Sequence, residues 1–256
     1  MPDTPQIKWA PHFAQTLRAM QGTLHSLEKR VPPPQRIVSG DSFEYRYIEK
    51  TLHQALIQKL ARVVSGLQAA WVLLEHGFVQ EQGALQRMLD EFQEDILFLV
   101  HGASEGAMTD LHREYLDAFY QEESADPAAP ARPMVSRQKI RAFLSRIPGA
   151  ALDPSTFVGT TKRISNAYSG YVHGASPNIM DMYGGDPPNF HVAGMLGTPR
   201  IDEHSADLWN YFYRGITCFA VTAKAFGDAD LFKVVRKYAD DFVQACDMAH
   251  AVSLKR

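Results

Sequence analysis

The residues best suited to chemistry begin with a charged stripe. Arg87, Glu91 and Asp95 recur every four positions, which places them on one face of a helix. A carboxylate that borders an apolar face can have a raised pKa and can take part in a polar pocket. The simpler interpretation is a solvated face on which Arg87 and Glu91 form an ion pair. The sequence leaves both interpretations open.

A second polar stripe consists of Lys162, Asn166, Ser169 and His173, at spacings of four, three and four residues. These spacings also place the side chains on one helix face. Gly170 lies beside the stripe, so a ligand or another chain could approach this face closely. The alternative is that the stripe is the solvated side of its helix.

The segment from Tyr171 to Arg200 is rich in glycine and proline and lacks helical periodicity. Irregular segments of this length within compact domains are typically functional or disordered. Several apolar side chains argue against disorder, so we expect a loop that packs onto the helices and forms a polar hollow. Its candidate ligand-binding residues are Tyr171, Asn178, Asp181, Tyr183, His191 and Arg200.

His173, Asp181 and His191 could together ligate a metal ion, because imidazole and carboxylate groups are common metal ligands. Their spacing matches no metal-binding motif. In the simpler interpretation, His173 bonds to carbonyl groups at a helix end and Asp181 caps a turn. Metal binding is therefore an alternative, and we assign no metal ligands.

The elements that would carry these residues are helices, because apolar residues recur every three or four positions along most of the chain. The first helix should end before the proline run that follows Arg30. The predicted ranges are about Trp9–Arg30, Asp41 or Ser42 to Gly77, Gln80–Gly102, Met108–Glu123, Ser136–Arg146, a helix after Asp153, Asp202–Phe226 and Asp228–Ala251.

The second of these helices would contain about 36 residues and span roughly 50 Å, unless it kinks near Ser65–Gly66. The third helix is apolar almost all round in its second half, which favours a central position. A small hairpin within Asn189–Leu196 is the one candidate for β-structure.

These patterns predict an all-α bundle of about seven to eight helices, with one long irregular loop before the last two. The stretch Ala125–Pro133 reads as a proline–alanine linker. The wide apolar faces on both sides of it favour one domain over residues 1–256.

Composition excludes some classes of protein. The net charge of −3 offers no strong field for nucleic acid or anionic membranes. No apolar run approaches the roughly 20 residues that span a bilayer. The chain has two cysteines, Cys218 and Cys246, both within helical patterns, which indicates a cytosolic protein without disulfides.

Several catalytic signatures are missing from the sequence. A carboxylate-bridged di-iron bundle needs Glu-x-x-His pairs, and the chain has none. It also lacks His-Glu-x-x-His, the Walker A motif and Gly-x-Gly-x-x-Gly. The sequence therefore favours no common hydrolase, kinase or dehydrogenase, and it leaves any cofactor unknown.

The stretches LQRMLDEFQEDILFL, TDLHREYLDAFYQEE and SNAYSGYVHGASP resemble uncharacterised bacterial helical proteins grouped near the HEPN domains. The resemblance covers roughly Leu85 to Asn178. It implies that Arg87 and Glu91 on one helix face Tyr171 and His173 at the end of another. HEPN ribonucleases carry Arg and His separated by four to six residues. Here nine residues separate Arg163 from His173, so that motif is not met.

Three hypotheses follow. The first is a ligand-binding or regulatory module that uses the 171–200 loop to bind a small molecule or protein, and that could form a homo-oligomer. The second is a metal-independent nuclease or phosphodiesterase, with His173 as general acid–base, Arg87 as phosphate ligand and Glu91 beside them. The third is the metal-binding protein.

Overall fold

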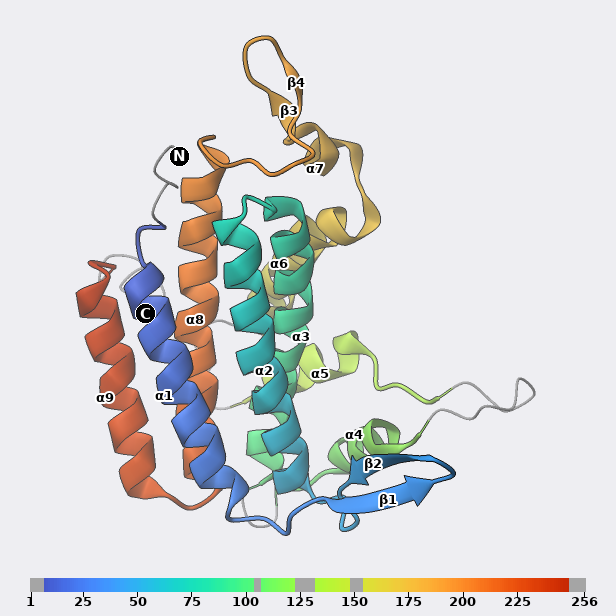
Figure 1. Cartoon of the computed structure of the whole chain (residues 1–256). Coiled ribbons are helices and arrows are strands. Elements are labelled where there is room, and N and C mark those ends of the chain that lie inside the picture. Colours follow the sequence, from blue (N-terminus) through green and yellow to red (C-terminus); the bar gives the residue numbers. More distant parts are fainter. Residues whose placement is uncertain (1–6, 104–106, 123–131, 148–153, 249–256) are drawn as a thin grey trace.

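The chain folds into a helical bundle with two small β-hairpins, as the computed structural model shows (Figure 1). The structure describes residues 7–103, 107–122, 132–147 and 154–248. Its helices are α1 (Ala10–Glu28), α2 (Leu52–Glu75), α3 (Val79–Gly102), α4 (Asp110–Tyr120), α5 (Arg137–Leu144), α6 (Pro154–His173), α7 (Ser176–Met180), α8 (Arg200–Ala225) and α9 (Ala229–Ala245). Its strands are β1 (Gln35–Ser39), β2 (Ser42–Arg46), β3 (Tyr183–Gly184) and β4 (Asn189–Phe190). The all-α prediction is confirmed.

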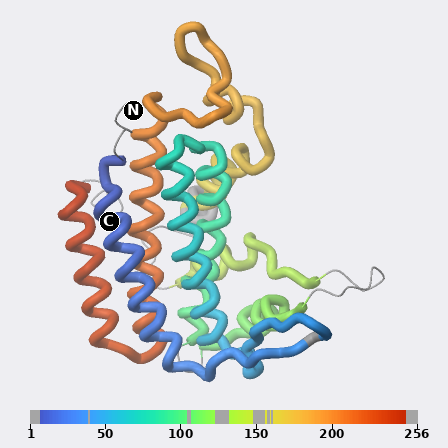
Figure 2. The backbone as a smooth tube through the Cα atoms, in the orientation of Figure 1, coloured from blue at the N-terminus to red at the C-terminus, as the bar shows by residue number. Residues whose placement is uncertain are grey.

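The long helices α1, α2, α3, α8 and α9 lie side by side and enclose the core (Figures 1 and 2). Phe13, Leu60 and Phe212 are among its fully buried side chains. Asp228 caps α9 by accepting a hydrogen bond from the backbone N–H of Leu231, as the sequence predicts. Most of the predicted linker, residues 125–131, lies outside the described residues, as does the predicted end of the last helix near Ala251.

The predicted start of the second helix is wrong. Asp41 and Ser42 do not cap a helix, because β1 and β2 pair as an antiparallel hairpin in which Ser39 faces Ser42. Gly40 has φ +57° in the turn, a conformation that glycine adopts without strain. The helix α2 starts instead after Thr51, whose hydroxyl accepts a hydrogen bond from the N–H of Gln54.

The helix α3 occupies the centre, as predicted, and it touches α2, α4, α5, α6 and α8. One of its faces is polar rather than apolar. The amide of Gln82 donates to the carbonyl of His204 at 3.1 Å, and that of Gln93 donates to the carbonyl of Tyr211 at 3.3 Å. Buried amide groups thus join α3 to the backbone of α8, which the sequence reading missed.

The charged stripe on α3 ends in a buried ion cluster. Asp95 is 3% exposed and lies 2.7 Å from Lys59 and 2.6 Å from Arg137. Beside it, Glu94 receives a 2.9 Å hydrogen bond from Arg141. Burial raises the pKa of Glu94 despite the two neighbouring arginines. In this cluster the positive charges of Lys59 and Arg137 compensate the negative charge of Asp95.

Several apolar residues at helical spacing lie outside the core. Ile48 and Ile164 are exposed. On α9, Val234 and Ala245 face solvent rather than the core. Val235, Ala239 and Phe242 carry that helix's buried face instead. Ile48 precedes α2, so its helical spacing to Leu52 does not place it on that helix.

The 171–200 segment does not pack over the bundle as predicted. Its first residues complete α6, and residues 176–198, which we call the arm, project from the bundle end (Figure 1). The arm contains α7 and the β3–β4 hairpin, the latter a few residues earlier than predicted. Most of its side chains are exposed, with Met195 the buried exception among them. The arm is therefore attached to the bundle at its base, and its outer part extends away from the helices.

The base of the arm fits closely against the turn between α2 and α3. The N–H of Met195 donates to the carbonyl of Gly77 at 2.8 Å, and Gln80 donates to the carbonyl of Asn178 at 2.7 Å. Gly194 has φ +109°, and a Cβ there would lie 2.3 Å from the carbonyl oxygen of His76. Because no side chain fits at this contact, glycine at position 194 allows the arm to pack directly against the backbone of the α2–α3 turn.

Candidate functional site

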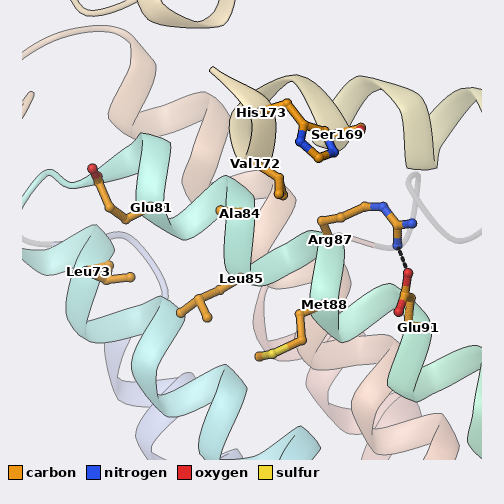
Figure 3. Close-up of a pocket in the computed structure, with 10 residues that line it drawn as sticks. All are labelled: Leu73, Glu81, Ala84, Leu85, Arg87, Met88, Glu91, Ser169, Val172 and His173. Carbon is orange, nitrogen blue, oxygen red and sulfur yellow. Dashed lines mark ion pairs between the residues drawn. The ribbon is translucent and has the colours of Figure 1, made fainter. Parts of the chain in front are cut away.

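An open groove of about 710 Å³ runs between the first half of α3 and the end of α6 (Figure 3). Its lining divides into an apolar floor and polar groups along the walls. The apolar residues are Leu73, Ala84, Leu85, Met88 and Val172; the polar residues are Glu81, Arg87, Glu91, Ser169 and His173. A groove of this size and lining can hold a small molecule or part of a peptide.

Helical spacing presents the polar residues to the groove. Arg87 and Glu91 are one turn apart on α3, and Ser169 and His173 are one turn apart on α6. The two helices approach closely because the Tyr171 ring lies over Gly83. A Cβ at that glycine would lie 2.8 Å from the ring.

The guanidinium of Arg87 is held by Glu91 at 2.8 Å across one helical turn. Their side chains are 20% and 38% exposed, so both remain accessible from the groove. Arg137 donates a 3.2 Å hydrogen bond to the backbone carbonyl of Glu91 from the other side. The ion pair thus orients Arg87 on a backbone that α5 supports.

His173 enters the groove from α6, and its ring points toward α3 on the side of Arg87 (Figure 3). It is exposed, and within the described part of the chain no hydrogen bond or ion pair engages it. An exposed imidazole opposite a guanidinium can bind an anionic group or transfer a proton.

The structure brings together the three residues that the sequence singled out for catalysis. His173, Glu91 and Arg87 all line this groove. Asp95, the third member of the stripe, does not line it and belongs to the buried cluster. Ser169 joins His173 from the second stripe, whereas Lys162 and Asn166 are exposed outside the groove lining.

The six predicted ligand-binding residues do not line the groove. Arg200 forms ion pairs with Asp181 and with Glu203, the latter at 2.7 Å. Tyr171 lies nearby, and burial together with the charge of Asp181 raises the pKa of its hydroxyl. With Asn178, whose carbonyl binds Gln80, these residues stabilise the base of the arm.

The other two predicted residues lie in the β3–β4 region. The Tyr183 ring contacts Phe190 edge to face, with centroids 4.9 Å apart. The His191 ring is close to Gly184 and Gly185. Neither residue is part of the groove lining.

The fold does not bring together the three side chains that could ligate a metal ion. Within the described residues, no group of three or more His, Cys, Asp or Glu side chains is placed to hold a metal ion. His173 lies in the groove, Asp181 is paired with Arg200, and His191 is in the hairpin region. The three predicted ligands are therefore separated by the fold.

Sequence reasoning missed Glu81 and the apolar floor of the groove. Glu81, Leu85 and Met88 recur at helical spacing on α3 beside Arg87. Leu85 and Met88 are only partly buried. Leu73 comes from the end of α2, a contact that periodicity within one helix cannot reveal.

No family model, curated protein or solved structure matches this chain. The resemblance to HEPN-like proteins therefore stays a prediction. Among the described helices, none is both long and apolar enough to cross a bilayer.

Proposed function

We propose that this protein binds an amphipathic small molecule in the groove between α3 and α6. The ligand has an apolar body and an anionic or hydrogen-bond-accepting end. One observation carries the proposal: Arg87 and His173, from helices distant in sequence, line the same groove, which has an apolar floor. The groove rather than the arm is the binding site, which modifies the expectation from the sequence.

The floor and walls have separate roles in this proposal. An apolar body that covers about 100 Å² of the floor contributes roughly 2.5 kcal/mol of binding free energy. Arg87 donates hydrogen bonds to the anionic end, and Glu91 keeps the guanidinium in place. His173 adds a donor that the described residues leave unengaged.

Anilinonaphthalene sulfonate is a suitable probe, because it combines an aromatic body with an anionic group. Binding is followed by fluorescence at low protein concentration. We expect Arg87→Met and His173→Ala each to weaken binding about tenfold, the effect of losing one charged hydrogen bond. Lys162→Ala is the matched control, because this exposed residue lies on α6 outside the groove. Equal affinities in all four proteins would exclude the groove as the site.

The second candidate function is metal-independent cleavage of a phosphodiester. The observation that favours it is the open position of His173 opposite Arg87. His173 would accept the proton of the ribose 2′-hydroxyl as its oxygen bonds to phosphorus, and Arg87 would stabilise the charge on the phosphate. The bond from phosphorus to the 5′-oxygen would break, and the protonated His173 would return its proton to that leaving oxygen.

The test is incubation of single-stranded RNA with the protein in the presence of EDTA. We expect cleavage that His173→Ala reduces at least about a hundredfold, the usual contribution of a general acid–base. The wild-type protein and Lys162→Ala should cleave equally well. Intact RNA after incubation with the wild-type protein would remove this function and leave the binding function in place.

A further inference from the structure

We infer that the ligand of the α3–α6 groove is dipolar, with an ammonium group that Glu81 binds at one end and a carboxylate that Arg87 binds at the other. This inference rests on the proposed function, and it adds the positive charge and the length of the ligand. A free peptide of about three residues with an apolar central side chain has this chemistry. An ω-amino acid of similar length has it too.

The charges of the groove lining do not balance. Counting histidine as neutral, the lining has two carboxylates, those of Glu81 and Glu91, and one guanidinium, that of Arg87. Glu91 is paired with Arg87 at 2.8 Å. Glu81 is exposed, and within the described part of the chain no hydrogen bond or ion pair engages it. The excess negative charge of the groove therefore lies at Glu81, where a purely anionic ligand would leave it uncompensated.

The two charged ends of the groove lie on either side of apolar surface. Glu81 is at one end of the lining and Arg87 is toward the other (Figure 3). Ala84, Leu85 and Val172 lie between them in this view. A carboxylate, an apolar middle and a guanidinium in this order complement a ligand that carries an ammonium group, an apolar centre and a carboxylate.

The spacing of the two charged residues sets the length of the ligand. Glu81 and Arg87 are six residues apart on α3, which is a rise of roughly 9 Å along the helix axis. Three residues of extended peptide span roughly 10 Å, so both end groups can reach the two side chains at once. A single amino acid spans roughly 3 Å and reaches only one of them.

The ion pair with Glu91 leaves Arg87 able to bind the carboxylate of the ligand. Glu91 contacts the guanidinium through Nη1, and a guanidinium has five N–H donors in all. Ser169 and His173 line the facing wall of the groove. Their side chains can form hydrogen bonds with peptide groups or with the same carboxylate.

The position of Glu81 in the first turn of α3 has a second explanation, because a carboxylate there interacts favourably with the positive end of the helix dipole. That effect needs no ligand. Asp202 holds a similar place in the first turn of α8, is exposed and does not line the groove. Asp202→Asn is therefore the matched control for Glu81→Gln, because both lose a first-turn charge and only Glu81→Gln should change ligand binding.

The test compares the peptide Ala-Leu-Ala with its N-acetylated form, which lacks the ammonium charge. Titrations are followed by the amide NMR signals of the protein. We expect the wild-type protein to bind the free peptide about fivefold more tightly than the acetylated one, the upper end for an exposed ion pair. This ratio should fall to about one in Glu81→Gln and stay unchanged in Asp202→Asn, a comparison that removes the effect of the acetyl group's bulk. Equal affinities of the two peptides for the wild-type protein, or a preference that Glu81→Gln retains, would overturn the inference.

Titration with ω-aminooctanoate distinguishes the two sources of the ligand, because this compound has the same end groups and no peptide bond. Affinity equal to that of the peptide supports a dipolar ligand recognised by its end charges and apolar centre alone. Weaker binding that still depends on Glu81 supports a peptide, whose amide groups then add hydrogen bonds. Binding of neither compound at millimolar concentration would overturn the dipolar ligand.

These measurements separate the inference from the proposed function. If binding of anilinonaphthalene sulfonate depends on Arg87 and His173 but the two peptides bind equally, the proposed function stands and the dipolar ligand fails. If Arg87→Met and His173→Ala leave probe binding unchanged while the peptide preference depends on Glu81, the function proposed for an anionic amphiphile fails and the dipolar ligand stands.

Discussion

Replacement of Asp95 by asparagine tests whether the charged stripe stabilises the fold at its buried end. The other two members of the stripe, Arg87 and Glu91, line the groove instead. Asp95 is 3% exposed, with Lys59 at 2.7 Å and Arg137 at 2.6 Å. The substitution keeps the shape of the side chain and removes its charge. Lys59 is only 12% exposed, so solvent cannot fully replace the lost partner.

The expected loss is large because a buried pair is broken on one side only. Removing one partner of such a pair costs about 3–5 kcal/mol, since the remaining charge stays buried without compensation. Arg137 keeps its hydrogen bond to the backbone carbonyl of Glu91, but its nearest remaining carboxylate is Glu94 at 3.9 Å. The total free energy of unfolding of a domain is about 5–15 kcal/mol, so Asp95→Asn should leave a marginal protein.

Urea unfolding followed by circular dichroism measures this loss. The matched control is Glu91→Gln, one turn earlier on the same stripe. Because Glu91 is 38% exposed, its pair with Arg87 should contribute about 0–1 kcal/mol to stability. A loss below about 1 kcal/mol for Asp95→Asn, or equal losses in the two variants, would mean that the whole stripe is a solvated helix face.

Three further predictions concern glycine contacts and pH. Gly83→Ala should cost about 1–3 kcal/mol and weaken probe binding, because its methyl group meets the Tyr171 ring; unchanged urea unfolding would contradict this contact. Gly194→Ala should speed proteolysis of the arm, because the new Cβ collides with the carbonyl of His76; an unchanged cleavage rate would show that the base tolerates it. Burial lowers the pKa of His112 below 6.5, so the unfolded chain binds the proton more readily. The free energy of unfolding should therefore fall as pH drops below 6.5, by at most about 1.4 kcal/mol per pH unit from this group. His112→Gln should reduce that slope, and an identical slope would refute the assignment.

The sequence predicts the helices because each depends on periodicity within one segment. The ends of α1 and α3 and the cap at Asp228 follow from local rules. The β1–β2 hairpin was missed because the helical spacing from Ile48 to Leu52 extended the helix pattern backward. Its strands have five residues each, and only β2 alternates polar and apolar residues, which is a weaker signal than a long amphipathic stripe.

The candidate site was predictable in part. Arg87, Glu91 and His173 were named from stripe spacing and resemblance, and they line one groove. The floor could not be predicted, because Leu73 reaches it from another helix. The burial of Asp95 was also hidden, since its partners Lys59 and Arg137 are remote in sequence. Partners of this kind appear only once the helices are packed.

The amides of Gln82 and Gln93 have a consequence for how the bundle tolerates change. Aliphatic side chains between two helices allow small axial translation, because their contacts are non-directional. An amide that donates to a backbone carbonyl allows much less, since the hydrogen bond weakens steeply with misalignment. Two such bonds, to the carbonyls of His204 and Tyr211, prevent α3 from sliding along α8. Arg87 lies between Gln82 and Gln93 on α3. Its position along the helix axis therefore stays fixed when surface residues around it are substituted.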